Sequence, residues 1–139
     1  MTPEQAQAQA CREVAKAIGY TVSKAPSNLP DGCYWMTNPK GELILLSAHS
    51  TEEGCWSTYP LFMEGGAAAR EECEEWLLRK HNIKLSIGQT VESVWILPMR
   101  GDRLTQAWEY FASAGSGSTL AEARAWAITN AVRAMTGGK

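Results

Sequence analysis

Three arginines are the residues of this sequence best suited to binding an anion. Arg100 and Arg103 flank a Gly-Asp pair, and Arg124 interrupts an otherwise apolar run near the end of the chain. A guanidinium is planar and presents several fixed donors, so it grips a phosphate or carboxylate in two places where an ammonium acts as a point charge. The sequence therefore predicts Arg100, Arg103 and Arg124 as candidate contacts for an anionic ligand.

A glycine- and serine-rich segment leads directly into the last predicted helix. Thr119 and Glu122 have the spacing of a capping box, so the helix is expected to begin after Thr119. Backbone amides at a helix N-terminus, aided by the helix dipole, can hold a phosphate. Ser118 and Thr119 are therefore candidate ligand contacts. No Walker lysine accompanies them, and a plain Gly/Ser connector explains the same residues, so both interpretations stay open.

Aromatic residues add a possible stacking surface. Residues 47–66 contain glycines, a proline and several rings but no sustained periodicity, which predicts one long loop. Within it, Trp56 and Tyr59 are the candidates for stacking on a base. Apolar side chains in a loop of this length must either pack back or meet a partner. Self-association is therefore also predicted, with a homodimer as the commonest symmetric form, through the apolar loop residues Trp56, Tyr59, Leu61 and Phe62.

Catalytic and metal-binding signatures are weak. His49 and Cys55 form the least unfavourable pair, but they have no defined geometry and no accompanying acid or base, so a small cysteine/histidine enzyme is a minor alternative. The four cysteines contain no CxxC pair, which favours buried thiols over a zinc or redox site. The acidic run at residues 71–75 is expected to face water. We therefore expect no enzyme activity, no metal and no cofactor.

The composition excludes several classes of protein. The chain has 139 residues, is 45% hydrophobic and 20% charged, and carries a net charge of −2. No apolar run approaches the roughly 20 residues of a membrane span. Generic nucleic-acid binding is not expected for a chain without a basic stripe. Because the first residues lack a basic segment followed by an apolar run, a cytoplasmic location is expected.

The expected elements form one α+β domain over residues 1–139. The predicted order is α-β-β-(long loop)-α-β-β-β-α, which implies an antiparallel β-sheet with helices packed on it, an α/β sandwich. Capping signals, periodicity and turn residues place helices at 3–18, 67–81 and 120–135, and strands at 33–37, 42–46, 83–87, 91–98 and 104–113.

The last helix has an alanine-rich apolar face that allows close approach to the sheet. Large strand residues such as Trp95 and Trp108 are expected to fill the space beneath it and to be mostly buried. Arg124 lies near the middle of that face, where its guanidinium must extend to solvent, pair with a carboxylate or meet a ligand. Trp126 lies on the opposite flank, where exposure would indicate a contact surface.

Several of these features occur together in a known family. They are an N-terminal helix ending in Gly-Tyr, a Trp-containing hairpin with Asn-Pro-Lys-Gly, Ser-Thr-Tyr-Pro before an Ala-rich helix, Trp-bearing strands, and a terminal Thr-Leu-Ala-Glu-Ala helix. In these respects the chain resembles the phage ABA sandwich domain family of small phage and prophage proteins. The resemblance implies a two-layer or three-layer α/β sandwich in the bacterial host cytoplasm, and it supplies no catalytic residues.

Two functions follow as hypotheses. The first is a noncatalytic phage or prophage accessory protein that binds a small anionic ligand, such as a nucleotide immune signal sequestered as an anti-defence measure, or a host protein. The second uses the α-β-β-β-α order of residues 67–135, which is also that of double-stranded RNA-binding domains. Those domains need lysines at the start of the last helix, and Gly-Ser-Gly-Ser-Thr provides none. The sequence therefore favours the first function.

Overall fold

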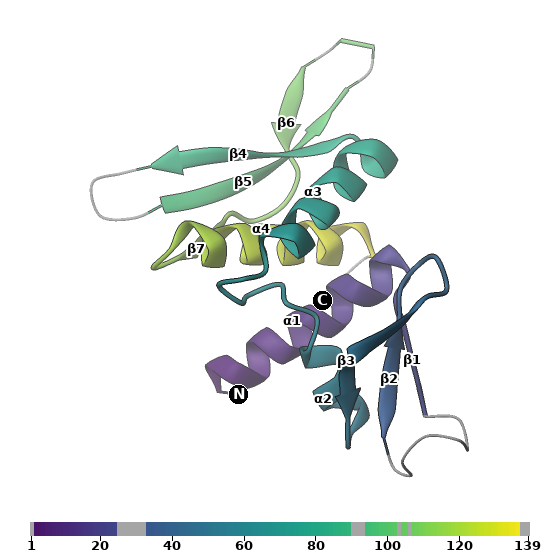
Figure 1. The fold of residues 1–139 in the computed structure, drawn as a ribbon. Coiled ribbons are helices and arrows are strands. Elements are labelled where there is room, and N and C mark those ends of the chain that lie inside the picture. Colours follow the sequence, from purple (N-terminus) through teal and green to yellow (C-terminus); the bar gives the residue numbers. More distant parts are fainter. Residues whose placement is uncertain (1, 25–32, 90–93, 103, 106, 137–139) are drawn as a thin grey trace. The chain divides into compact units, whose positions relative to one another are not determined.

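The structure is a computed structural model that describes residues 2–24, 33–89, 94–102, 104–105 and 107–136 (Figure 1). It confirms the expected α+β class, with two antiparallel sheets and helices packed on them. Contacts within the expected single domain fall into two compact units, Met1–Pro60 and Leu61–Lys139.

The first unit combines two helices with a three-stranded antiparallel sheet of order β1-β2-β3. The capping box predicted at its start is confirmed, because Thr2 accepts from the Gln5 amide and the Gln5 side chain accepts from the Thr2 amide. Gly19 ends the first helix with a φ of 121°, which glycine adopts without strain. The elements are α1 (Pro3–Ile18), β1 (Thr21–Lys24), β2 (Tyr34–Thr37), β3 (Leu43–His49) and α2 (Glu52–Ser57).

Residues 47–66 differ from the expected loop. Strand β3 continues to His49, and the short helix α2 follows at once. Thr51 caps α2 by accepting from the Gly54 amide, and Glu52 and Glu53 lie in the first turn, where negative charge favours the helix N-terminus. The sequence therefore contains a local signal for the start of α2, but the helix has too few residues to show a helical period.

The second unit is a two-layer arrangement of helices on one sheet. Strands β4, β5 and β6 are neighbours in that order, and β7 also pairs with β5. Helix α4 contacts β5 and β7, and α3 contacts β4 and α4. The elements are α3 (Ala67–His81), β4 (Ile83–Gln89), β5 (Val94–Gly101), β6 (Trp108–Tyr110), β7 (Gly115–Gly117) and α4 (Leu120–Met135).

The core of the second unit corrects the expectation for two tryptophans. Ile96 packs with Ala123 and Ala127 of α4, and Pro98 on the same strand face is also fully buried. Trp95 alternates with these residues and is only partly buried, as is Trp108. Small and medium side chains therefore fill the space under α4, because its alanines bring the helix too close to the sheet for an indole.

The described helices include none that is long and apolar enough to cross a membrane. All four cysteines are free thiols, as the sequence predicts. Cys11, Cys55 and Cys73 are buried, and Cys33 is partly exposed. Buried thiols of this kind act as small apolar side chains in the core.

Candidate ligand-binding pocket

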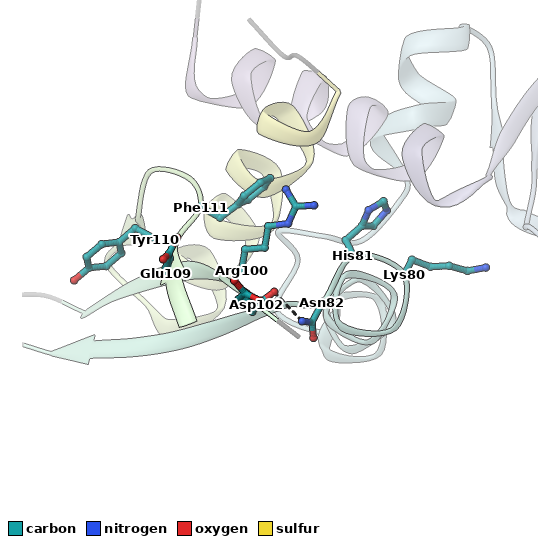
Figure 2. Close-up of a pocket in the computed structure, with 9 residues that line it drawn as sticks. Lys80, His81, Asn82, Arg100, Asp102, Glu109, Tyr110 and Phe111 are labelled. Atoms are coloured by element: carbon teal, nitrogen blue, oxygen red, sulfur yellow. Dashed lines mark hydrogen bonds between the residues drawn. The ribbon is translucent and has the colours of Figure 1, made fainter. Parts of the chain in front are cut away.

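An open pocket of about 640 Å³ lies in the second unit, where the end of α3 meets the ends of β5 and β6 (Figure 2). Pockets of roughly 300–1,000 Å³ are typical of sites for small molecules. Three stretches line it, each supplying consecutive residues: Lys80, His81 and Asn82; Arg100, Gly101 and Asp102; and Glu109, Tyr110 and Phe111.

Asn82 fixes the geometry of the pocket by joining α3 to β5. It ends α3 in the left-handed conformation, with a φ of 53°, which asparagine adopts more readily than most residues. Its Nδ2 donates to the Gly101 carbonyl at 2.9 Å, and the Gly101 amide donates to the Asn82 carbonyl at 2.8 Å. This pair of hydrogen bonds holds the last turn of α3 beside Arg100.

Arg100 is the predicted ligand residue that lines the pocket. Its side chain is exposed, and its guanidinium carbon lies 5.6 Å from the centroid of the Phe111 ring. Within the part of the chain that the structure describes, no carboxylate forms an ion pair with Arg100. Glu109 faces it across the strand pair without such a contact. The Arg100 donors are therefore available to an anion.

The other polar side chains at the pocket divide into two groups. Figure 2 shows the rings of His81 and Phe111 on the same side as the Arg100 guanidinium, whereas Lys80 and Tyr110 point away. His81 packs edge-on against Trp76, with 4.7 Å between ring centroids. Asp102 accepts from the Leu104 amide at 2.8 Å, which uses its carboxylate to close the turn. Arg100 and His81 are thus the donors best placed for a ligand.

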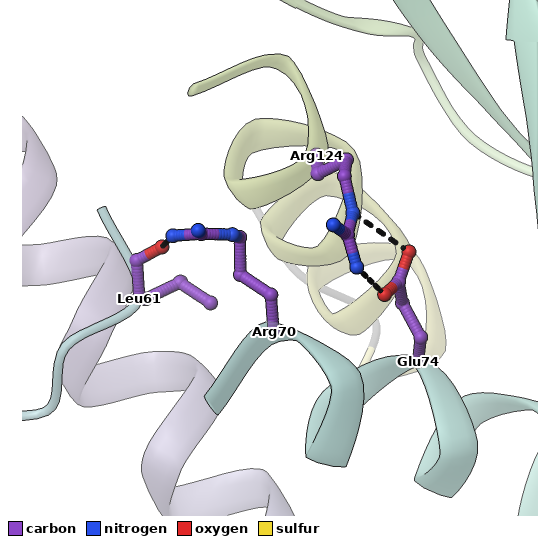
Figure 3. A network of polar contacts seen from close by, with 4 residues as sticks. All are labelled: Leu61, Arg70, Glu74 and Arg124. Carbon is purple, nitrogen blue, oxygen red and sulfur yellow. Dashed lines mark hydrogen bonds and ion pairs between the residues drawn. The ribbon is translucent and has the colours of Figure 1, made fainter. Parts of the chain in front are cut away.

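Arg124 is used by the fold instead. It forms a bidentate ion pair with Glu74 of α3 (Figure 3). The Arg124 Nε donates to Glu74 Oε1 at 3.1 Å, and the Arg124 Nη2 donates to Glu74 Oε2. The hydrogen bonds that Arg124 donates to Glu74 raise the pKa of Arg124, and burial opposes part of that rise. Of the three roles open to Arg124 in the sequence, pairing with a carboxylate is the one that the structure shows.

The start of α4 is likewise occupied by its own side chains. Thr119 accepts from the Glu122 amide at 3.1 Å, as the capping pattern predicts. Glu122 accepts from the Ser118 amide at 3.3 Å rather than from Thr119. Because these amides already have acceptors, the helix start offers an anion fewer donors than the sequence suggests.

The remaining predicted contacts are Trp56, Tyr59 and Arg103. Trp56 and Tyr59 belong to the first unit, where they are only 2% and 4% exposed. The Tyr59 ring packs on Tyr20 at 5.0 Å between centroids, and Lys16 lies 5.9 Å from the Trp56 ring. In this conformation neither ring offers a face on which a base can stack. Arg103 lies outside the described residues.

The apolar residues that suggested self-association are also mostly covered. Leu61 is fully buried along with Trp56 and Tyr59, and Phe62 packs edge-on against Trp126 at 4.8 Å between centroids. Trp126 is correspondingly only partly exposed. These residues therefore offer little exposed surface to a second copy of the chain.

Arg70 is a buried arginine that the sequence pattern does not reveal. Arg70 is 4% exposed and donates through one terminal nitrogen to the carbonyls of Leu61 and Met63, at 3.1 and 2.9 Å (Figure 3). These bonds hold the segment before α3 against the helix. His81, Asn82 and Phe111 were also absent from the predicted site. The basic last turn of α3 is a local signal for His81 and Asn82, whereas Phe111 has none, because its meeting with Arg100 depends on strand register.

The weak catalytic pair gains no support from its surroundings. His49 Nδ1 accepts from the Thr51 amide at 3.3 Å, which ties the imidazole to the start of α2. Cys55 is fully buried. Among the residues that the structure describes, no three histidine, cysteine, aspartate or glutamate side chains form a group that could hold a metal ion.

Comparison of the chain with protein-family models, with curated proteins and with solved structures finds no match.

Proposed function

We propose that this protein is a noncatalytic binding protein for a small anionic ligand, which it holds at the pocket around Arg100. The observation that carries the proposal is the state of the Arg100 side chain. It is exposed, packed over Phe111 and without a carboxylate ion pair in the described residues, whereas Arg124 is satisfied by Glu74. An exposed guanidinium beside a pocket is well suited to a phosphate or carboxylate.

The surroundings of Arg100 favour a ligand that has a planar ring as well as a negative charge. Arg100 already lies over the face of Phe111, so a planar ligand can extend this stack on the outer side of the guanidinium. The imidazole of His81 lies on the same side as the Arg100 guanidinium. Glu109 supplies an acceptor for an amino group. A nucleotide combines these features, with phosphate for Arg100 and a base for the rings.

The biological role that we propose is that of a phage or prophage accessory protein that sequesters a nucleotide signal of the host. The proposal draws on the resemblance to the phage ABA sandwich domain family and on the chemistry at Arg100. Capture of a host protein is the alternative if the pocket takes no nucleotide. Neither role requires a catalytic group.

The proposal predicts that Arg100→Ala weakens nucleotide binding by about tenfold or more, because it removes a charge-assisted contact. Binding is measured by calorimetry against cyclic dinucleotides, cyclic trinucleotides and cyclic ADP-ribose isomers. Ligands are first found by thermal shift, since a ligand at a hundredfold above its dissociation constant stabilises by about 2.7 kcal/mol.

Arg79→Ala is the matched control. Arg79 also lies on the last turns of α3, but it pairs with Glu75 at the surface and does not line the pocket. We expect this variant to bind as the unmodified protein does. Equal losses in both variants would indicate a general charge effect instead of a site at Arg100. A complete absence of binding across the panel would remove the nucleotide proposal.

A further inference from the structure

The sheet of the second unit has an outer face, turned away from α3 and α4, that is rich in large apolar residues. Residues paired across neighbouring strands share a face, and residues two apart along a strand do so as well. Lys84 and Tyr110 both pair with Met99, Ser86 pairs with Leu97, and Trp108 pairs with Gly101. We call this set the outer sheet face: Lys84, Ser86, Trp95, Leu97, Met99, Trp108 and Tyr110.

The side chains of the outer sheet face are accessible. Tyr110 is 74% exposed, and Trp95, Leu97 and Met99 are partly exposed along β5. On the opposite face of the same strand, Ile96 is 1% exposed beneath α4. In the described part of this unit both helices pack on the inner face, so the outer sheet face lacks the second layer that normally covers an apolar sheet surface.

The charge of the outer sheet face decides between two kinds of partner. Its seven residues include no carboxylate and a single cation, Lys84, whose ammonium lies 4.3 Å from the centroid of the Trp108 ring. Binding to nucleic acid depends on several lysines or arginines that neutralise phosphates. A nearly neutral, apolar surface instead fits another surface of the same kind, because burying it leaves few charges unpaired.

The strand register also makes the outer sheet face complementary to itself. Lys84 and Tyr110 lie on opposite sides of Met99, in one row across the three strands. A two-fold axis along β5 places Lys84 of one copy over Tyr110 of the other, and the same contact occurs twice. An ammonium is attracted to the face of a tyrosine ring, so this arrangement satisfies the one charge on the surface.

We propose that the outer sheet face is the interface of a homodimer in which Trp95, Leu97 and Met99 of two copies pack face to face. Three strands span about 10 Å, and seven residues of strand about 24 Å, which is small for a specific interface. The expected dimer is therefore weak, with a dissociation constant on the order of 100 µM. The inference is independent of what the Arg100 pocket binds.

Sedimentation velocity from about 10 µM to about 500 µM tests the proposal. The unmodified protein is expected to move from the 15.2 kDa monomer toward twice that mass. Two substitutions should each keep the protein monomeric. A dimer of Leu97→Glu would bury an unpaired carboxylate, and a dimer of Tyr110→Lys would place the new lysine opposite Lys84 of the other copy. Lys84→Glu added to Tyr110→Lys should restore the dimer, because the row then pairs opposite charges.

Leu104→Glu is the matched control, since Leu104 is 96% exposed in the turn before β6 and lies outside the outer sheet face. It should dimerise normally. Near-ultraviolet circular dichroism checks that each variant is folded. If Leu97→Glu is unfolded, the oligomeric state of Tyr110→Lys alone tests the proposed interface. A monomer at the highest concentration, or a dimer that both substitutions leave intact, would overturn the proposal. So would a monomer that binds oligonucleotides through these residues.

Discussion

Gly115→Ala is expected to lower the free energy of unfolding by about 3 kcal/mol or more, which is a large effect for one added methyl group. Gly115 is buried in β7, where the strand crosses directly against α4. A Cβ at this position would lie within 3.0 Å of the Ala127 amide nitrogen, the Ala127 Cα and the Ala123 carbonyl oxygen. These are backbone atoms of a helix, so no side-chain rotation can make room.

The measurement is chemical denaturation of Gly115→Ala beside Gly65→Ala. A Cβ at Gly65 has no atom within 4 Å, so that substitution should change the free energy of unfolding by less than about 0.5 kcal/mol. The comparison also bears on the glycine- and serine-rich segment as a phosphate loop. If Gly115 served a ligand instead of the packing of β7 on α4, Gly115→Ala would lose binding while keeping its stability.

Helix boundaries are the part of this fold that the sequence predicts best. Thr2 with Gln5, Asn82 and Thr119 each act on backbone groups within a few residues, so their spacing in the sequence contains the relevant geometry. The short helix α2 has the same kind of signal at Thr51, but its six residues are too few to show a period. Short elements such as α2 and β7 therefore escape prediction by periodicity.

Alternation within a strand predicts which residues share a face but not which face is covered. Because residues two apart along a strand share a face, Trp95 lies on the same face as Leu97, and Trp108 on the same face as Tyr110. The sequence predicts both indoles on the side of α4, because large rings on the strands could fill the space left by the small alanines of that helix. The structure shows the reverse arrangement: close packing of α4 leaves room for Ile96, and the rings lie on the outer sheet face.

Contacts between distant residues explain why the candidate site was predicted only in part. Arg100 could be selected by its chemistry alone, but the meeting of His81 with Arg100 depends on the register of β4 and β5. Arg124 and Glu74 are 50 residues apart, and four glutamates in the acidic run on α3 were equally plausible partners. Residue type therefore identifies the groups that can bind an anion, and only the fold shows which of them are already paired.

Arg124→Ala is expected to lower the free energy of unfolding by about 2 kcal/mol, because it removes two charge-assisted hydrogen bonds and leaves Glu74 without its partner. The side chains are 24% and 27% exposed, so solvent screens the pair only in part. A double-mutant cycle with Glu74→Ala should give a coupling energy of at least about 1 kcal/mol. The surface pair of Arg79 and Glu75, exposed by 75% and 55%, is the control and should couple by less than about 0.5 kcal/mol.

The pH dependence of this effect follows from the direction of the pKa change. Pairing with Glu74 raises the pKa of Arg124, so the folded state favours the charged guanidinium. Stabilisation of this sign is complete below the pKa that Arg124 has in the unfolded chain. It is lost only as the pH rises through the pKa of Arg124 in the folded state, which for arginine lies in strong alkali. The loss in Arg124→Ala should therefore be the same at about pH 7 and about pH 9. If Arg124→Ala instead kept full stability and abolished nucleotide binding, Arg124 would be a ligand contact and the pocket at Arg100 would not be the complete site.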